Sequence, residues 1–191
     1  MEKSKTSTDI YISFAENINE KTMQALLNVI GQYLGKGVEN IHLLLSTTGG
    51  SVMAGVDIYY KLRALPITFF TYNTGSINSV GNLLYLAGDY RYAVPHCSFM
   101  FHGVGINVGQ NQRIEEKNLR EHLNSIRRDQ ERVAKIIEER CNNVDLEEAR
   151  DLFLEAAFKT ADEAENMGLV HEICEFSIPK GVPFISLVFK S

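Results

Sequence analysis

Two glycine-framed stretches constrain this chain most, because each follows an apolar run and precedes a run with helical periodicity. They are Thr47–Ser51 and Gly75–Gly81, and a lone histidine, His102, follows them in an apolar setting. Glycine lets a backbone turn sharply, and the first N–H groups of the next helix have no partner within that helix. Two such turns present a nucleophile and free N–H groups to one cleft. This is the layout of an acyl-transfer site.

Length, charge and cysteine content narrow the setting of this site. The 191 residues carry a formal net charge of -5 and suit one domain, residues 1–191. This charge argues against a general binder of nucleic acid or membrane surfaces. Three widely spaced cysteines (Cys97, Cys141 and Cys174) indicate neither a disulfide framework nor a paired-cysteine metal site. Because no long apolar stretch or leader pattern is present, we expect a cytoplasmic protein.

Strand and helix patterns alternate along the first half of the chain. Strands are predicted over 10–14, 41–45, 67–72 and 90–94, with helices over 23–34, 52–62 and 79–87. Strand–helix alternation with turns at the strand ends predicts an α/β fold.

A long charged stretch, Asn111 to Arg140, has one narrow apolar seam: Leu119, Leu123, Ile126, Val133 and Ile137. A helix of about 30 residues is roughly 45 Å long, more than a small domain is wide, so part of it should project and offer a partner surface. The alternative is a helix that lies across its own domain. A second helix is expected from Asp145, a capping box at Thr160, and strands over 169–173 and 184–189.

Three candidate groups carry the chemistry, and each has a structural alternative. Ser79, at a strand-to-helix turn, is a candidate nucleophile with the Val80 N–H beside it, or simply a helix N-cap; Ser76 competes for either role. Gly49 and Gly50 form an oxyanion-binding turn or a plain tight turn. His102 is the natural base to activate a serine, or a hydrogen-bonded core histidine.

Taken in order, these stretches resemble the Clp peptidase family, serine proteases of the Clp and crotonase-like superfamily. Residues 46–55 resemble its strand-to-helix stretch, with Thr48 where proline is usual, and Asp57–Tyr59 continue the match. Residues 75–81 and 84–88 resemble the nucleophile turn and its helix. Residues 91–95 and 100–102 are similar to the segment that carries the general base. Residues 158–161 and 168–170 resemble the segment after the long helix, and the similarity spans roughly Ile10 to Glu175.

This resemblance implies a serine endopeptidase with a Clp/crotonase-like fold of repeated ββα units and a long handle helix at about 111–142. Ser79 would be the nucleophile, His102 the base, and the N–H groups of Gly50 and Val80 the oxyanion hole. No metal or organic cofactor is implied. The expected assembly is a homo-oligomer, a heptameric ring or two stacked rings (a tetradecamer), which cleaves polypeptide substrates inside a chamber.

Two departures from the family pattern bear on activity. The position expected for the triad aspartate is Ala156, so Glu155 is the candidate third member, with Asp151 about one turn earlier. A serine–histidine dyad and a catalytically weak chain are the other interpretations. The short segment before the first strand argues against coupling to an AAA+ ATPase.

Two other functions fit parts of the pattern. A catalytically weak or inactive Clp-like ring subunit or scaffold is favoured by Ala156 and opposed by the joint presence of Ser79, His102 and both turns. A crotonase-like acyl-coenzyme A enzyme shares the two turns but has no need of the serine–histidine pair.

Overall fold

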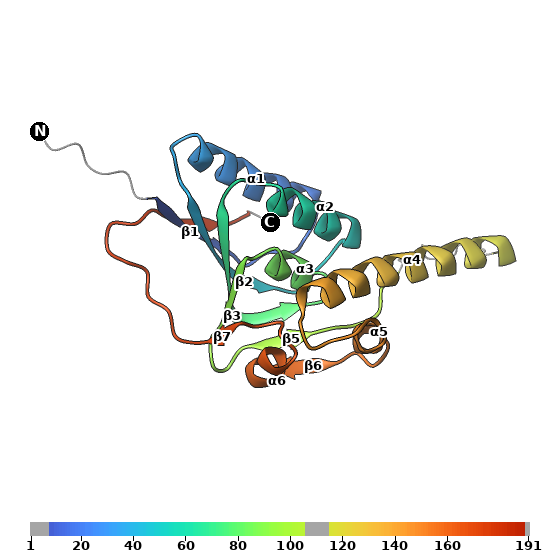
Figure 1. The fold of residues 1–191 in the computed structure, drawn as a ribbon. Coiled ribbons are helices and arrows are strands. Elements are labelled where there is room, and N and C mark those ends of the chain that lie inside the picture. Colours follow the sequence, from blue (N-terminus) through green and yellow to red (C-terminus); the bar gives the residue numbers. More distant parts are fainter. Residues whose placement is uncertain (1–7, 106–114, 190–191) are drawn as a thin grey trace, which may run out of the picture.

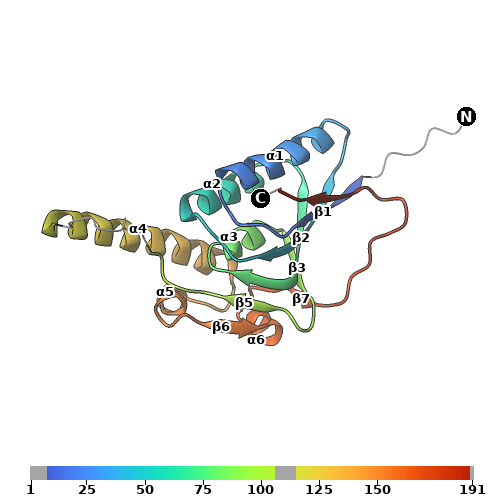
Figure 2. The same cartoon turned by 180° about the vertical axis from the view of Figure 1, so that it is seen from behind.

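The fold is seen in a computed structural model that describes residues 8–105 and 115–189. An eight-stranded sheet carries helices α1, α2 and α3 on one side, and helix α4 extends far beyond the sheet (Figures 1 and 2). The strands are β1 (Asp9–Phe14), β2 (Asn40–Thr47), β3 (Thr68–Asn78), β4 (Tyr90–Ala93), β5 (Ser98–Met100), β6 (Phe158–Thr160), β7 (Glu172–Ile173) and β8 (Phe184–Leu187). The helices are α1 (Glu20–Leu34), α2 (Val52–Arg63), α3 (Gly81–Leu86), α4 (Glu116–Arg140), α5 (Leu146–Leu154) and α6 (Ala161–Asn166). This mixed α/β architecture confirms the predicted fold class.

Strand β3 joins two parts of the sheet. The main order is β6-β5-β3-β2-β1-β8, while β4 pairs with β3 and with β7. The first half of β3 lies beside β4 and its second half beside β5, both in parallel. Among the strands of the described residues, β5 and β6 alone pair in antiparallel fashion. Since parallel strands point the same way, the carboxyl ends of β1, β2 and β3 lie at one edge.

Strand β3 is longer than the sequence predicts. Strand character was expected to end near Tyr72, with a turn from Gly75, but β3 continues to Asn78. The reason is pairing with β5, in which Ser76, Ile77 and Asn78 lie opposite Ser98, Phe99 and Met100. The turn itself is therefore confined to Ser79 and Val80.

The predicted starts of α5 and α6 agree with the structure better than the predicted end of β3 does. The side chain of Asp145 caps α5, and Thr160 and Glu163 form the predicted capping box at the start of α6. Phe158–Thr160 nevertheless forms a strand, β6, which the chain pattern alone did not reveal.

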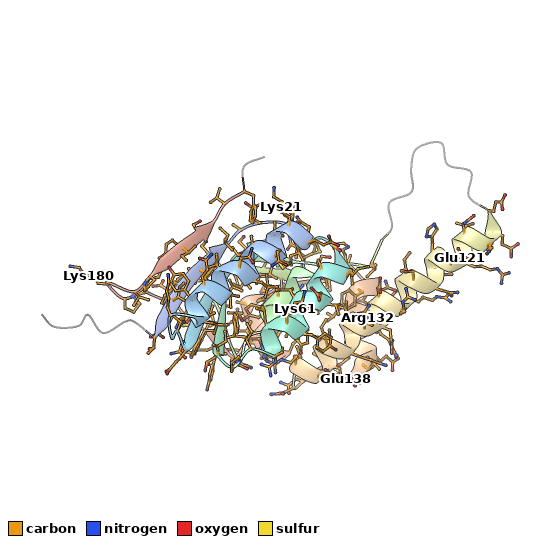
Figure 3. All side chains as sticks on the ribbon, turned by 90° about the horizontal axis from the view of Figure 1, so that it is seen from above. Lys21, Lys61, Glu121, Arg132, Glu138 and Lys180 are labelled. Atoms are coloured by element: carbon orange, nitrogen blue, oxygen red, sulfur yellow. The ribbon has the colours of Figure 1, made fainter. Side chains whose placement is uncertain are left out.

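Among the described residues, helix α4 packs against the rest of the protein through its C-terminal part. Near its C-terminus Val133, Ala134 and Ile137 are buried, whereas Leu119 and Leu123 are 55% and 46% exposed. Figure 3 shows Glu138 on the part beside the body and Glu121 on the part that stands clear of it. The predicted projection is confirmed for residues 116–140, while the first residues of the predicted handle, 111–114, lie outside the described residues.

The other face of the sheet carries a row of aromatic side chains. Rings of Tyr11, His42, Phe70 and Tyr90 stack from strand to strand at centroid separations of 4.3, 4.5 and 5.0 Å.

Within the described residues, no helix is long and apolar enough to cross a membrane.

Arg91 joins the ends of three helices. Its side chain is buried, and Nε donates to Leu169 O at 2.7 Å while Nη2 donates to Arg140 O at 2.9 Å and Gly168 O at 3.0 Å. Nη1 lies 3.4 Å from Gly88 O. These carbonyls lie at or just beyond the C-termini of α3, α4 and α6, where the helix dipoles place partial negative charge. No carboxylate among the described residues pairs with Arg91.

Arg91→Met should strongly destabilise the fold, because it leaves several buried carbonyl groups without donors. We expect the free energy of unfolding to fall by about 3–5 kcal/mol, measured by urea denaturation.

Arg63→Met is the matched control, since Arg63 forms a partly exposed ion pair with Asp89. It should cost no more than about 1 kcal/mol. Equal losses in the two variants would contradict a special role for Arg91.

Candidate active site

Ser79 occupies a strained turn between β3 and α3. Its φ of 56° lies in the left-handed region, which serine adopts at some cost. The Ser79 N–H donates to Met100 O at 2.7 Å, which ties the turn to the end of β5. Val80 and not Ser79 is the N-cap of α3, and Val80 makes no side-chain capping bond. The serine hydroxyl is therefore not used to cap the helix.

The side chain of Asn82 supports the serine turn, a role that the sequence pattern did not reveal. Its side-chain Nδ2 donates to Ser79 O at 2.9 Å and to Met100 O at 3.1 Å, and the residue is 1% exposed. An asparagine inside the first turn of a helix, where its propensity is low, was the available signal. Asn82 fixes the distance between the serine turn and β5.

The Gly49–Gly50 turn touches the serine turn directly. A Cβ atom at Gly49 would lie 2.7 Å from Asn78 O and 2.8 Å from Ser79 Cβ. At Gly50 it would lie 2.1 Å from Ile18 O. Both residues also have positive φ, 89° and 151°. Only glycine allows this contact between the two turns.

Two backbone N–H groups at this contact have no acceptor in the part of the chain that the structure describes. Ile18 accepts from the Ser51 N–H and donates to Gly49 O, both at 2.8 Å, and the Gly50 N–H between them makes no hydrogen bond to a described residue. The Val80 N–H likewise has no hydrogen-bond acceptor among residues 8–105 and 115–189. Paired free donors of this kind can stabilise a developing oxyanion.

His102 lies just beyond β5, which ends at Met100, and not on a strand as its apolar setting suggested. Its side chain is exposed, so it is not a buried core histidine. Nδ1 is 2.9 Å from Gly103 O. Because a carbonyl can only accept, Nδ1 is the donor in this hydrogen bond, and in the neutral imidazole Nε2 is then the acceptor. The described hydrogen bonds do not include one between Ser79 and His102.

Ala156 directly precedes the residues that pair with β5. The antiparallel pairing of Met100 with Phe158 continues through a hydrogen bond from the Phe101 N–H to Ala157 O at 2.8 Å. His102 and Ala156 are the residues next to this hydrogen bond on the two segments. Ala156 has a φ of 51°, a conformation that aspartate tolerates better than alanine.

Glu155, the candidate third member, has a different environment. It is the exposed C-cap of α5, and its N–H donates to Asp151 O at 3.0 Å. Glu155, Asp151 and Lys159 line a pocket of about 270 Å³. Neither carboxylate is hydrogen-bonded to His102 in the described part of the chain, so the role of Glu155 stays a prediction.

Two of the cysteines are buried thiols and not reactive ones. Burial raises the pKa of Cys97 and of Cys141 to about 11, which keeps both thiols protonated near neutral pH. In the described ranges no three His, Cys, Asp or Glu side chains are grouped so as to hold a metal ion.

Comparison with known proteins agrees with this geometry. A family model described as Clp protease matches residues 3–177. The "ATP-dependent Clp protease proteolytic subunit 1" of Corynebacterium jeikeium (strain K411) is 39% identical over 72 residues, which cover 37% of this chain and 38% of that relative. Since the family model spans nearly the whole chain, the protein belongs to the Clp protease family.

Proposed function

We propose that this protein is a serine endopeptidase. Ser79 Oγ attacks the peptide carbonyl, and His102 Nε2 accepts the hydroxyl proton and then passes it to the leaving amine. The N–H groups of Gly50 and Val80 bind the oxyanion of the tetrahedral intermediate. Water then releases the acyl group from Ser79 by the same proton transfers in reverse order.

One observation carries this proposal: a serine in the left-handed region lies directly against a double-glycine turn. The Cβ position of Gly49 would be only 3.4 Å from Ser79 Oγ. The two free N–H groups come from the residues that follow each partner, Gly50 and Val80. A tight turn without a catalytic role requires neither a strained serine nor unengaged donors.

The orientation of His102 would depend on a backbone carbonyl. In a serine triad an acid fixes the histidine tautomer and stabilises the imidazolium. Gly103 O supports the productive tautomer but carries no charge, so it stabilises the imidazolium less. We expect a turnover well below that of a complete triad. Glu155 would act as the third member only if the segment after α5 shifts.

The assembly proposed is a homo-oligomer, a heptameric ring that can stack as a tetradecamer through α4. Its sites would face a chamber that admits peptides and unfolded proteins. The relative's name includes ATP dependence, and an AAA+ ATPase partner for this chain remains a weaker proposal. A cytoplasmic location agrees with three free cysteines, and nucleic acid and membranes are not proposed as partners.

The second candidate is a non-catalytic ring subunit of the same fold. It is favoured by an alanine, Ala156, at the position where the family pattern has the triad aspartate, and by the lack of a hydrogen bond between Ser79 and His102 among the described residues. Both candidates predict assembly, but only the first predicts an activated serine.

A fluorophosphonate probe should form one covalent adduct with the assembled protein, because it reacts with activated serines in a working oxyanion site. Intact-mass analysis should show this adduct in the parent and not in Ser79→Ala, while Ser76→Ala should still be labelled. No adduct on the assembled parent would favour the non-catalytic subunit.

Ala156→Asp should raise peptidase turnover, because it puts a carboxylate at the position where the family pattern has the triad aspartate. At least a tenfold rise in kcat is expected, against a loss of about four powers of ten where a triad aspartate is removed. Steady-state cleavage of a fluorogenic peptide measures it. Ala157→Asp is the control, and equal rates in the two variants would contradict the placement.

Leu119→Asp combined with Leu123→Asp should weaken contact between rings, because both side chains are exposed on the free part of α4. Light scattering should show a lower mass for this variant. Lys117→Glu, on the same stretch, should keep the parent mass. A parent that is monomeric at micromolar concentration would contradict the assembly itself.

A further inference from the structure

A small polar pocket adjoins both turns of the candidate site. It has a volume of about 160 Å³ and is lined by the carboxyl ends of the parallel strands β2 and β3 and by the loop after β1. Since a water molecule occupies about 30 Å³ of the liquid, the pocket has room for roughly five waters or one side chain. Its lining is polar except for Ala15, and consists otherwise of Glu16, Asn17, Ser46, Thr47, Thr48, Ser76 and Asn78.

The pocket lies next to the proposed nucleophile. Asn78 immediately precedes Ser79, and Thr48 immediately precedes Gly49, whose Cβ position would be 3.4 Å from Ser79 Oγ. A peptide whose carbonyl is placed against Ser79 would therefore bring a neighbouring side chain to this pocket.

Hydroxyl groups orient the two amides that line the pocket. Thr48 Oγ1 donates to Asn17 Oδ1. Ser76 Oγ donates to Asn78 Oδ1 at 2.8 Å and accepts from Ser98 Oγ at 3.1 Å. Both amide oxygens are thus occupied. The Nδ2 groups of Asn17 and Asn78 have no acceptor within residues 8–105 and 115–189.

Glu16 adds one acceptor to these donors. Its Oε1 accepts from the Phe189 N–H at 3.3 Å, while its backbone carbonyl accepts from Thr47 Oγ1 at 2.7 Å. Oε2 has no donor in the described part of the chain. No lysine or arginine lines the pocket, so Glu16 supplies its only formal charge among the described lining residues.

This set of groups discriminates among side chains. A carboxylate would accept from the amide N–H groups but would be repelled by Glu16. An ammonium group would pair with Glu16 but would face the same N–H groups. An apolar group would leave all of them without partners, which is costly when they are desolvated. A carboxamide can accept from the asparagines and donate to Glu16.

We propose that this pocket is a substrate subsite that receives a glutamine or asparagine side chain next to the cleaved bond. The inference rests on the proposed peptidase function, because that function places a peptide against Ser79. It adds a specificity that the catalytic groups themselves do not provide.

Binding to Ser79→Ala tests the subsite without turnover. Labelled peptides of one sequence would carry glutamine, methionine, lysine or glutamate at each position beside the cleaved bond. Fluorescence anisotropy should show the glutamine peptide binding about five- to tenfold more tightly than the near-isosteric methionine peptide, and more tightly than the two charged ones.

Two variants in this Ser79→Ala background locate the effect. Glu16→Gln should reduce the preference for glutamine at least threefold. Asn78→Asp keeps the acceptor for Ser76 and replaces the free N–H groups by a carboxylate oxygen, so it should shift the preference to lysine. Glu20→Gln, which alters a glutamate lining a separate groove between α1 and α2, should change nothing.

The proposal is overturned if methionine, lysine or glutamate binds as tightly as glutamine, if no peptide binds, or if Glu16→Gln and Glu20→Gln behave alike. Failure of the peptidase function is recognised separately. In that case the protein with Ser79 intact neither cleaves the glutamine peptide nor reacts with a fluorophosphonate, while selective binding to Ser79→Ala persists.

Discussion

The buried guanidinium of Arg91 is the interaction on which the rest of the structure depends. It gathers carbonyl groups from the ends of α3, α4 and α6, segments that are far apart in the sequence. Arg140 also contacts the C-terminus of α3, because its side chain donates to Leu86 O and Gly88 O at 3.1 and 2.7 Å. Because α3 begins directly after the serine turn, a clamp on its C-terminus also fixes its N-terminus. The base of the projecting helix is held by the same cation.

The two halves of the candidate site differ in rigidity. The serine turn and the double-glycine turn are in backbone contact and are tied to β5 by Asn82 and by the Ser79 N–H. His102 is exposed, and its side chain is held by one bond to its neighbour. Preorganised donors contribute most when they need no rearrangement during the reaction. Under the proposed function, the oxyanion half would meet that condition, and the placement of the base would limit the reaction.

Local signals in the sequence were sufficient to predict elements whose caps or buried faces are set by residues within the element itself. The helix that starts at Asp145, the capping box at Thr160 and the apolar run of β2 were predicted because their determinants lie within a few residues. The extension of β3 to Asn78 was not predicted, because it depends on pairing with β5, 22 residues further along the chain. The Clp protease family was recognised from ordered motifs. The supporting contacts of Arg91 and Asn82 were missed, because buried polar networks leave no periodic pattern in a sequence.

The left-handed conformation of Ser79 also bears on how this chain could change over many generations. Glycine at this position would relieve a backbone strain of about 1–2 kcal/mol, and the fold would gain stability while losing the hydroxyl. If the hydroxyl had no use, random substitution would thus move readily toward glycine. Exchange of Ser79 for glycine in related chains would therefore mark the lineages in which this site has been abandoned.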